Sequence, residues 1–497
     1  MWGDPFRVAF APPTISASLK GSPYIEHAMA TEWTADEIRR VGRLVVDLIA
    51  DHLTSLPGRP AFRPIPAALA QEMAATPPPA DPVSPDDILR RFTETIEPYP
   101  FGNASCAGGN HAAIHLEREV LEWFRELLRF PRGAMGLLVS GGSMATMTAM
   151  AVARHVKSGV DVRQDGLRGA GAPFAFYMTT EGHSCARKAI ELLGFGSASI
   201  RIVPTTDAYT MDVAALDNAI AADRRAGVRP IAVVATAGTT NTGAIDDLQA
   251  IAAVCRRHDV WMHVDAAYGG PAILSDRYGS AIAALAHADS AVVDPHKWMF
   301  VPVEAGFVIV RDGEAMRSAF SLVPSYIRTQ GSAGEVYGQP WFSEYGFQQT
   351  RGFRALKVWM AMQQFGTRGY KAIVEENIAL AQYLADRVRG AEDFELMAPS
   401  SLSVVCFRYV DASTAIEGAD AEVAAAERES AAAALNRAVL ERLQLSGEAF
   451  ITSTELRGRF VLRACVVNYR STREDVDRML DAVRTIGREV GAATGLR

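Results

Sequence analysis

Hydrophobic residues in the first part of the chain follow the spacing of an amphipathic helix. Within residues 35–53, apolar side chains recur every three or four positions, at Ile38, Val41, Leu44, Val45, Leu48 and Ile49. Thr34 and Glu37 stand at the capping-box spacing, so we expect the helix to begin directly after Thr34. A helix with one apolar face packs that face against another surface.

Short apolar runs alternate with helical patterns from about residue 108 to about residue 370. The runs are GLLVS, FAFYMTT, SIRIVP, PIAVVATAGTT, VWMHVDAA, DSAVVD and GFVIV. Buried strands that alternate with helices predict an α/β domain with a mostly parallel sheet. We expect this large domain to occupy residues 104–370.

The remaining segments predict two smaller units and a tail. Residues 371–497 contain the strand patterns LSVVCFRYV and GRFVLRACVV, an Ala- and Glu-rich solvated helix, and a last helix from about Arg473. They predict a small α+β C-terminal domain. Residues 34–103 predict an N-terminal helical arm followed by a connector that is rich in proline at 57–85 and that we expect to be extended. Residues 1–33 show no periodicity and predict a loose tail.

The amino-acid composition indicates the broad class of protein. The 497 residues are 49% hydrophobic and 22% charged, which is typical of soluble globular proteins. A net charge of −7 gives no sign of nucleic acid or an anionic membrane as partner. No apolar run is long enough to span a bilayer, and the first residues do not resemble a secretory signal. The five cysteines lack CxxC spacing, which favours reduced thiols and a cytoplasmic location.

The segment DSAVVDPHKWMF, residues 289–300, carries the first candidate chemistry. An apolar strand runs into Pro295 and then presents His296 and Lys297. A lysine in an apolar setting is costly unless it is paired or modified, and a Schiff base with a carbonyl group is one solution. The alternative is a lysine at a strand end with its amine in water.

The segment VWMHVDAAYGG places Asp265 at the end of another apolar strand, one crossover before Lys297. Two strand ends of one sheet can point both side chains into the cleft where α/β sheets bind ligands. An acid at that position could pair with the protonated pyridine nitrogen of a cofactor that draws electrons. A helix cap is the alternative for Asp265.

Three further strand ends carry groups that suit a cofactor. In LLVSGGSMAT, two glycines precede a helix whose first N–H groups could hold a phosphate, although many helices start this way. His183 could stack on an aromatic ring or could be a surface histidine. Thr239 could line a cofactor edge or belong to an ordinary turn. His111, His115 and Glu117 suggest a metal site, but a helix surface or core explains them better, and we expect no metal.

Taken together, SGGSMAT, EGHSCARKA, ATAGTT, HVDAAY, DPHKW and RGFRALKVW resemble the pyridoxal-5′-phosphate-dependent decarboxylases of the group II family, which act on aromatic amino acids, tyrosine, histidine or glutamate. The resemblance runs from about Thr34 to about residue 490. It implies a fold-type-I, aminotransferase-like large domain and a homodimer with active sites at the subunit interface, clasped by the N-terminal arm. It also implies decarboxylation of an L-amino acid to an amine and CO2.

The resemblance implies a role for each candidate at the cofactor. Lys297 forms the Schiff base, and Asp265 pairs with the pyridine nitrogen. The remaining candidates surround the ring and the phosphate: His183 and Ala267 on the two ring faces, Thr239 beside the ring substituents, and Gly142, Ser143 and His296 at the phosphate.

The resemblance also implies two groups that act on the substrate. The segment SYIRTQGSAGEVYGQPW is similar to the family's catalytic loop, in which Tyr337 would protonate the substrate Cα, with Tyr345 as the alternative. Arg463 would lie near the substrate carboxylate, with a structural salt bridge as its alternative.

The chain departs from the family pattern after residues 101–103. These pass straight into Ala104, without the aromatic stretch that family members carry before the large domain. We therefore expect cofactor binding with an altered or impaired substrate side. An aromatic L-amino acid is the expected substrate. Glutamate or aspartate, an aldehyde synthase reaction and a non-catalytic cofactor-binding dimer are the alternatives.

Overall fold

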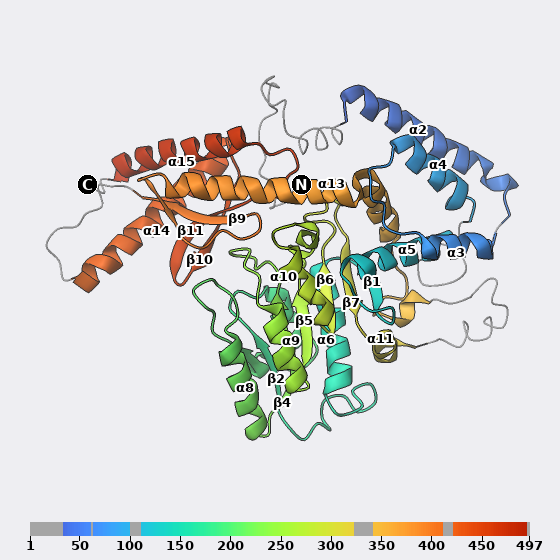
Figure 1. The fold of residues 1–497 in the computed structure, drawn as a ribbon, viewed down its shortest axis with the longest axis horizontal. Helices are drawn as coiled ribbons and strands as arrows, with labels where there is room; N and C mark the ends of the chain where they lie inside the picture. The colour runs from blue at the N-terminus through green and yellow to red at the C-terminus, as the bar shows by residue number, and fades with distance from the viewer. Residues whose placement is uncertain (1–32, 61–62, 100–110, 323–340, 411–420, 495–497) are drawn as a thin grey trace.

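The computed structural model describes residues 33–60, 63–99, 111–322, 341–410 and 421–494 (Figure 1). Each of the seven apolar runs predicted as a strand forms one strand of a seven-stranded sheet with the order β1-β7-β6-β5-β4-β2-β3. The strands are β1 (Met135–Val139), β2 (Phe174–Met178), β3 (Ile200–Ile202), β4 (Arg229–Thr236), β5 (Trp261–Asp265), β6 (Ser290–Val293) and β7 (Gly306–Val310). The predicted α/β class is confirmed.

The sheet is parallel except for one strand. β7 pairs antiparallel with both β1 and β6, whereas β2, β3, β4, β5 and β6 pair in parallel. β1 therefore runs in the same direction as the parallel strands. The carboxyl ends of these six strands meet at one edge of the sheet, where open α/β sheets bind ligands.

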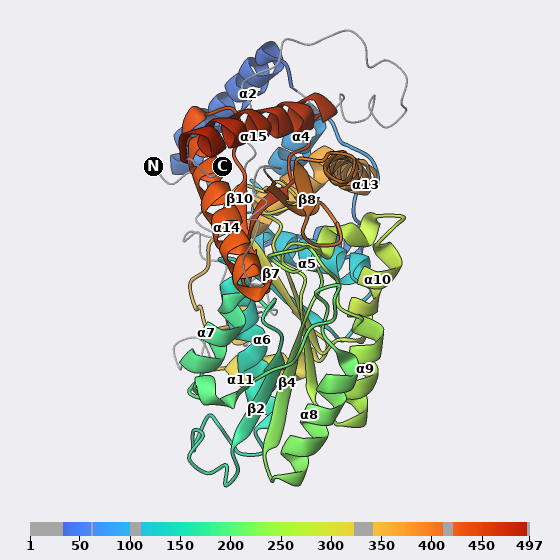
Figure 2. The same ribbon diagram turned by 90° about the vertical axis from the view of Figure 1, so that its left-hand side faces the viewer.

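Helices cover both faces of this sheet (Figure 2). One side carries α6 (Gly142–Lys157), α7 (Ser184–Leu192) and α11 (Gly313–Phe320), and the other carries α8 (Val213–Arg225), α9 (Leu248–Arg257) and α10 (Gly279–Ala283). Every residue of β5, β6 and β7 is buried, which explains why their sequences are continuously apolar rather than alternating. Short helical turns lie at Leu56–Gly58, Ser197–Ser199, Gly270–Leu274, Ala284–His287 and Phe342–Glu344.

The N-terminal arm begins as predicted and continues differently. α2 (Ala35–Ser55) starts with the expected capping box, in which the Glu37 N–H donates to Thr34 Oγ1 at 3.2 Å and the Thr34 N–H donates to Glu37 Oε2 at 2.8 Å. The prediction of an extended connector at 57–85 is wrong in part, because it contains α3 (Ala67–Ala75) and is followed directly by α4 (Pro85–Thr95). Alanine-rich AALAQEMAA favours a helix despite the prolines on both sides.

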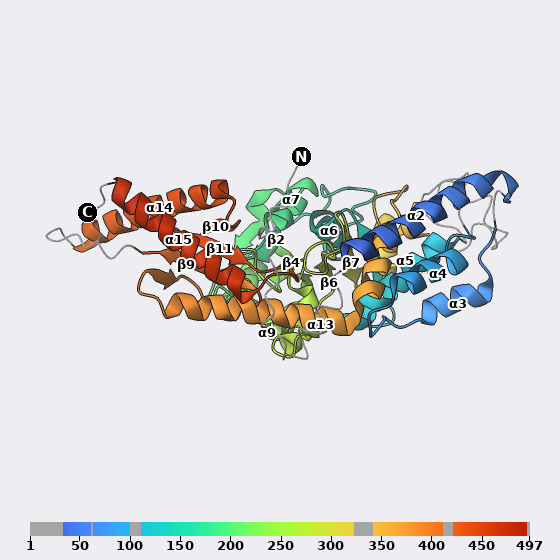
Figure 3. The same ribbon diagram turned by 90° about the horizontal axis from the view of Figure 1, so that it is seen from above.

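The connector packs on the large domain rather than hanging free. Ile65 and Met73 belong to the main hydrophobic core, together with residues of α5 (Ala112–Leu127). The Trp123 indole N–H donates to the Thr76 main-chain oxygen at 2.8 Å. The arm is thus fixed at its base, while α2 projects away from the sheet (Figures 1 and 3).

A long helix joins the two hydrophobic cores. α13 (Arg354–Arg389) is kinked at Gly366, where φ is +62° and a Cβ would meet the main chain of Asp81. Its residues up to Ile378 belong to the core of the large domain, and those from Ala381 belong to the second core. The change of core therefore falls within one helix, eight residues or more after position 370, and our domain limits remain predictions.

The second core lies under a four-stranded antiparallel sheet with the order β10-β11-β9-β8. The strands are β8 (Phe394–Leu396), β9 (Val404–Tyr409), β10 (Thr452–Leu456) and β11 (Arg459–Cys465), flanked by α14 (Ala421–Ser446) and α15 (Arg473–Thr494). The predicted strands β9 and β11 and the helices α14 and α15 are confirmed. β8 and β10 were not predicted, since three residues of β8 and the polar TSTEL of β10 carry little hydrophobic signal.

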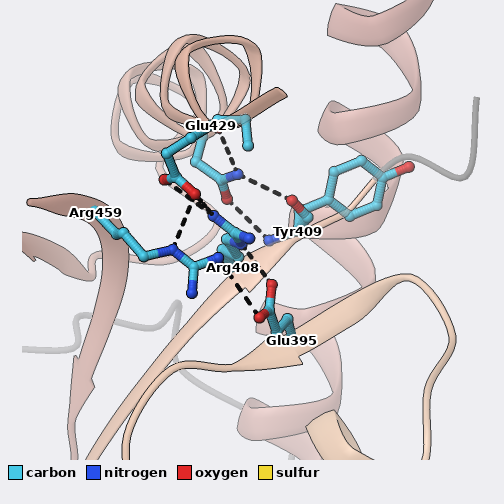
Figure 4. A network of polar contacts seen from close by, with 7 residues as sticks. Glu395, Arg408, Tyr409, Glu429 and Arg459 are labelled. Carbon is cyan, nitrogen blue, oxygen red and sulfur yellow. Dashed lines mark hydrogen bonds and ion pairs between the residues drawn. The ribbon is translucent and has the colours of Figure 1, made fainter. Parts of the chain in front are cut away.

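Charged side chains fasten α14 to this sheet (Figure 4). Arg408 on β9 donates to Glu395 Oε2 at 2.7 Å and to Glu429 Oε2 at 2.9 Å, and Arg459 also reaches Glu429 at 2.9 Å. Asn436 on α14 bonds both the N–H and the carbonyl oxygen of Tyr409. We predicted α14 as a solvated helix, but these contacts attach one of its sides to the small sheet.

Within the described ranges, no helix has the length and apolar character needed to cross a membrane. Four cysteines lie in these ranges, Cys185, Cys255, Cys406 and Cys465, and all four carry free thiols.

Candidate active site

The structure brings the predicted cofactor residues to the carboxyl edge of the large sheet. They follow five strands in turn: Gly142 and Ser143 after β1, His183 after β2, Thr239 after β4, Asp265 and Ala267 at the end of β5, and His296 and Lys297 after β6. The turns after β5 and β6 are tied together, because the Asp294 N–H donates to the Ala267 oxygen at 3.0 Å. Residues as far apart in the sequence as Gly142 and Lys297 therefore lie at the same edge of the sheet.

Lys297 lies in a turn that also holds two other titratable side chains. Its Nζ is 3.1 Å from Asp294 Oδ2, and His296 Nε2 is 3.8 Å from the same oxygen. The His296 Nδ1 lies 2.6 Å from the Ala305 carbonyl oxygen and 3.3 Å from the Ala305 main-chain nitrogen, so the main chain at Ala305 holds the ring in place. The lysine amine is partly exposed and paired, which leaves it accessible to a carbonyl group.

Asp265 is buried at the end of β5. Its Oδ1 accepts the Ala267 N–H at 3.1 Å, which is a local turn contact, while Oδ2 is left open to a ligand. Two residues earlier on the same face, His263 is fully buried and bonds Ser290 Oγ at 2.9 Å. Burial lowers the pKa of His263 to about 4, so this imidazole is neutral at neutral pH. No cation is therefore supplied to Asp265 from that side.

The loop between β1 and α6 has the shape of a phosphate cradle. Gly141 has a φ of +137°, which favours glycine, and a Cβ on Gly306 would collide with its main chain. A Cβ on Gly142 would lie 2.7 Å from Asp294 Oδ2, so this position also needs glycine. Ser143 is exposed in the first turn of α6, where free N–H groups and the helix dipole favour an anion.

His183 and Thr239 differ in how far they are available. His183 is exposed, and its Nδ1 accepts the Cys185 N–H at 3.2 Å, which fixes the ring at the start of α7. The Thr239 hydroxyl is buried and accepts the Ala244 N–H at 3.0 Å within a tight turn. Thr239 thus has the turn role that we held as its alternative, and its contact with a ring remains a prediction.

Arg463 lies on β11 of the small sheet and reaches the large domain. Its Nε donates to the Asn241 main-chain oxygen at 3.1 Å, and its Nη1 lies 3.5 Å from Thr452 Oγ1. Among the described residues, no carboxylate forms an ion pair with it. The salt-bridge alternative is therefore absent from the part of the chain that the structure describes, and a substrate role stays a prediction.

The two candidate tyrosines are not equally placed. Tyr337 and the predicted catalytic loop up to residue 340 lie outside the described residues, as do residues 100–110, where the chain departs from the family pattern. Tyr345 is half-buried, and burial raises its pKa. Its charged neighbours are Arg317, Glu344 and Glu314, none of which belongs to the candidate site.

The metal alternative finds no support in the structure's described part, where no three His, Cys, Asp or Glu side chains are grouped to hold an ion. Glu117 instead forms a buried ion pair with Arg351, with Nη1 3.0 Å from Oε2. The same guanidinium donates to the Leu138 oxygen at 2.6 Å. This contact braces β1, the strand that leads into the phosphate cradle, and gives RGFRALKVW a structural role.

Two site residues were missed by the sequence analysis, Asp294 and Asn241. Asp294 is the first residue of the DPHKW motif, three positions before Lys297. The spacing of the two residues in the sequence does not indicate that Asp294 is buried next to the lysine amine. Asn241 donates to Glu181 Oε2 at 3.0 Å and accepts from Thr454 Oγ1 at 2.6 Å, which joins the loops after β2 and β4 to the small sheet. No sequence signal indicates that contact, because it bridges residues 213 apart.

These residues fit pyridoxal 5′-phosphate. The glycine cradle at α6 suits the phosphate, Asp265 suits the pyridine nitrogen, and Lys297 suits the aldehyde. Asp294 Oδ1, a buried oxygen with no hydrogen-bond partner, faces the same region.

Comparison with known proteins gives the same picture. Residues 109–410 match the family described as the pyridoxal-dependent decarboxylase conserved domain. The chain is 30% identical to the aromatic-L-amino-acid decarboxylase of Bacillus atrophaeus over 487 residues, which covers 92% of this chain and 97% of that protein. It is 26% identical to the phenylacetaldehyde synthase of a Rosa hybrid cultivar, covering 88% and 91%. The crystal structure of Oryza sativa TDC with PLP and tryptamine has a TM-score of 0.68 at 27% identity, covering 92% of this chain and 98% of that chain.

Proposed function

Because the chain belongs to the pyridoxal-dependent decarboxylase family, and is thus a carboxy-lyase that uses pyridoxal 5′-phosphate, we propose that it decarboxylates an aromatic L-amino acid to the amine and CO2. The observation that carries the proposal is that Lys297, Asp265 and the first turn of α6 all lie at one edge of the sheet. The aromatic substrate is supported by the bacterial relative and by the rice protein, whose structure contains tryptamine.

When bound, the cofactor supplies a protonated pyridine ring that accepts the electron pair of the Cα–carboxylate bond. Asp265 holds the proton on the pyridine nitrogen through its open Oδ2. His183 would contact one face of the ring, and the Ala267 methyl group would contact the other. Lys297 would hold the cofactor aldehyde through its amine.

The substrate is oriented by groups at the rim. Arg463 reaches the loop after β4 from the small sheet and is the cation proposed to hold the substrate carboxylate. Tyr337, outside the described residues, is proposed to donate the proton that Cα needs after CO2 leaves. A tyrosine at this position, rather than a phenylalanine, favours simple decarboxylation over the aldehyde synthase reaction.

The working unit is proposed to be a homodimer. α2 buries only Val41, whereas Val46 is 64% and Leu53 59% exposed, and Ile38 and Ile49 are also exposed. Isolated helices of this kind are marginal in water, and most helical stability comes from packing of an apolar face. A partner subunit clasped by α2 would cover these side chains. The four free thiols are in keeping with the proposed cytoplasmic location.

The test is a substrate panel on the purified protein supplied with pyridoxal phosphate. Release of CO2 and amine from L-tryptophan, L-tyrosine or L-DOPA, with little from glutamate or aspartate, is expected. Peroxide or aldehyde formed in place of the amine would assign the aldehyde synthase reaction. No CO2 from any L-amino acid, with cofactor bound, would make the chain a non-catalytic binding protein. Lys297→Ala is the control and should be inactive.

A further inference from the structure

Asp294 is a buried acid with an unsatisfied oxygen in the middle of the cofactor site. Its side chain is 3% exposed. Oδ2 contacts the amine of Lys297 at 3.1 Å, and Oδ1 has no hydrogen-bond partner. A buried carboxylate normally satisfies both oxygens, so a vacant one indicates a missing partner.

The same carboxyl group faces the phosphate cradle. A Cβ on Gly142 would lie 2.7 Å from Oδ2, so the acid abuts the first turn of α6. A phosphate seated on that turn would therefore meet a carboxyl oxygen. Two anions at contact distance repel each other strongly in a buried site, whereas a protonated carboxyl group can donate a hydrogen bond to a phosphate oxygen.

We propose that Asp294 binds the cofactor phosphate as a neutral acid, with one proton taken up at its carboxyl group for each cofactor bound. In the free protein the carboxylate is paired with the Lys297 ammonium. The carboxyl group takes up a proton from solvent when the phosphate arrives, and no reaction at the Lys297 amine is needed for this. The proton then stays on the carboxyl group, which donates it in a hydrogen bond to the phosphate. This inference rests on the phosphate position proposed above.

The surroundings of Asp294 favour the protonated form. The groups that face it are Lys297 and His296 on its own turn, Asp265 on β5 and Cys185 on α7, while α6 contributes the main chain at Gly142. Burial already raises the pKa of Asp294, although the two cations act against it. Burial also raises the pKa of Cys185 to about 11, so this thiol stays neutral. Arrival of the phosphate anion shifts the balance further toward the acid.

The test uses pyridoxine 5′-phosphate, which has the ring and the phosphate but no aldehyde, so that binding is measured without reaction at Lys297. Its dissociation constant is measured from pH 6 to pH 9 on the wild-type chain and on Asp294→Asn. Asparagine donates a hydrogen bond at every pH. The ratio of the wild-type constant to the variant constant is expected to rise with pH, by about 30-fold or more over this range. The second ionisation of the phosphate is common to both proteins and cancels in the ratio.

Two controls isolate Asp294. Asp247→Asn, at the exposed N-terminus of α9, should leave the ratio flat, since asparagine caps a helix as well as aspartate does. The second control compares His296→Asn with the double variant His296→Asn/Asp294→Asn. The ratio of their dissociation constants should still rise with pH. A ratio that no longer rises would assign the titration to His296 and overturn the proposal.

A wild-type measurement keeps the test independent of how the variant folds. Infrared difference spectra on addition of pyridoxine 5′-phosphate should show a protonated carboxyl band appearing while a carboxylate band is lost. A ratio constant within about twofold, or no such band, would overturn the role of Asp294 alone. Failure of the wild-type chain to bind pyridoxine 5′-phosphate or pyridoxal phosphate at any pH would overturn the cofactor site itself.

Discussion

The Nε of Arg463 donates a hydrogen bond to the main-chain oxygen of Asn241 at 3.1 Å, so a strand of the small sheet holds the loop that carries Thr239. The Asn241 side chain extends the link to Glu181, next to the turn that bears His183. The small domain therefore fixes the position of two cofactor loops. An arginine that forms this link and also meets a substrate would couple substrate binding to the shape of the site.

Arg463→Lys is expected to lower kcat/KM about 10- to 100-fold, mainly through KM, because a lysine cannot make the forked contact with a carboxylate. Steady-state kinetics with the preferred amino acid measure this. Arg459→Lys is the matched control, since Arg459 lies on the same strand but pairs with Glu429. A fall in melting temperature with unchanged KM would show that Arg463 is structural only.

Asp265→Asn should lower kcat/KM by about 10² to 10³-fold, because a neutral amide does not hold the pyridine nitrogen protonated. Asp265→Glu should recover part of the loss. The absorbance of the bound cofactor checks that the site is still loaded. Asp289→Asn, at the amino end of β6, should retain activity, since its amide can still accept the Met262 N–H. Equal activity of Asp265→Asn and the parent would refute the role of Asp265.

Gly142→Ala should weaken pyridoxal phosphate binding by about 10-fold or more, with a cost of about 1 to 3 kcal/mol, because its Cβ would press on Asp294. Equilibrium titration of the unloaded protein measures the dissociation constant. Gly133→Ala is the control, since a Cβ there meets nothing within 4 Å. Unchanged affinity of Gly142→Ala would place the phosphate elsewhere.

Glu119 gives a pH dependence of stability that is separate from catalysis. This fully buried acid on α5 bonds Arg91 of α4 at 3.0 Å and the Trp359 indole of α13 at 3.3 Å. Burial raises its pKa from 4.5 to about 7, with Arg91 acting against the shift. The folded state thus holds a proton that the unfolded state releases between these values. Stability from this group is fully present below about pH 4.5 and is lost as the pH rises to 7.

Glu119→Gln should therefore lose less stability than the parent between pH 5 and pH 8, by about 3 kcal/mol at most. Urea unfolding of the two proteins at each pH measures the difference. Glu122→Gln, exposed on the same helix, should follow the parent. Parallel curves for the parent and Glu119→Gln would mean that Glu119 is ionised in the folded state.

The sequence predicted the large sheet well because most of its strands are buried on both faces, the edge strand β3 being the exception. Runs such as VWMHV and GFVIV are typical of strands buried on both faces, and VWMHV leads directly into Asp265 and Ala267, two candidate site residues. β8 and β10 escaped prediction because short or polar strands of an antiparallel sheet depend on neighbours for their stability. α3 was not predicted, because the prolines on both sides of its alanine-rich sequence indicated an extended segment.

Some residues of the candidate site could also be predicted from the sequence, and others could not. Lys297, Asp265 and the glycines of α6 could be predicted because motif and strand end coincide. The link from Asn241 to Thr454 could not, since it depends on how two domains dock. The pairing of Asp294 with Lys297 was within reach, as three residues in a turn bring side chains together, but its burial needed the fold.

Lys297 as the site of cofactor attachment is the central claim, and one measurement tests it most directly. The protein is loaded with pyridoxal phosphate, reduced with borohydride, digested and mapped by mass spectrometry. The account predicts a phosphopyridoxyl group on Lys297 at close to one per chain, and none at this site in Lys297→Ala. A label found mainly on another lysine, or no stable label, would contradict it.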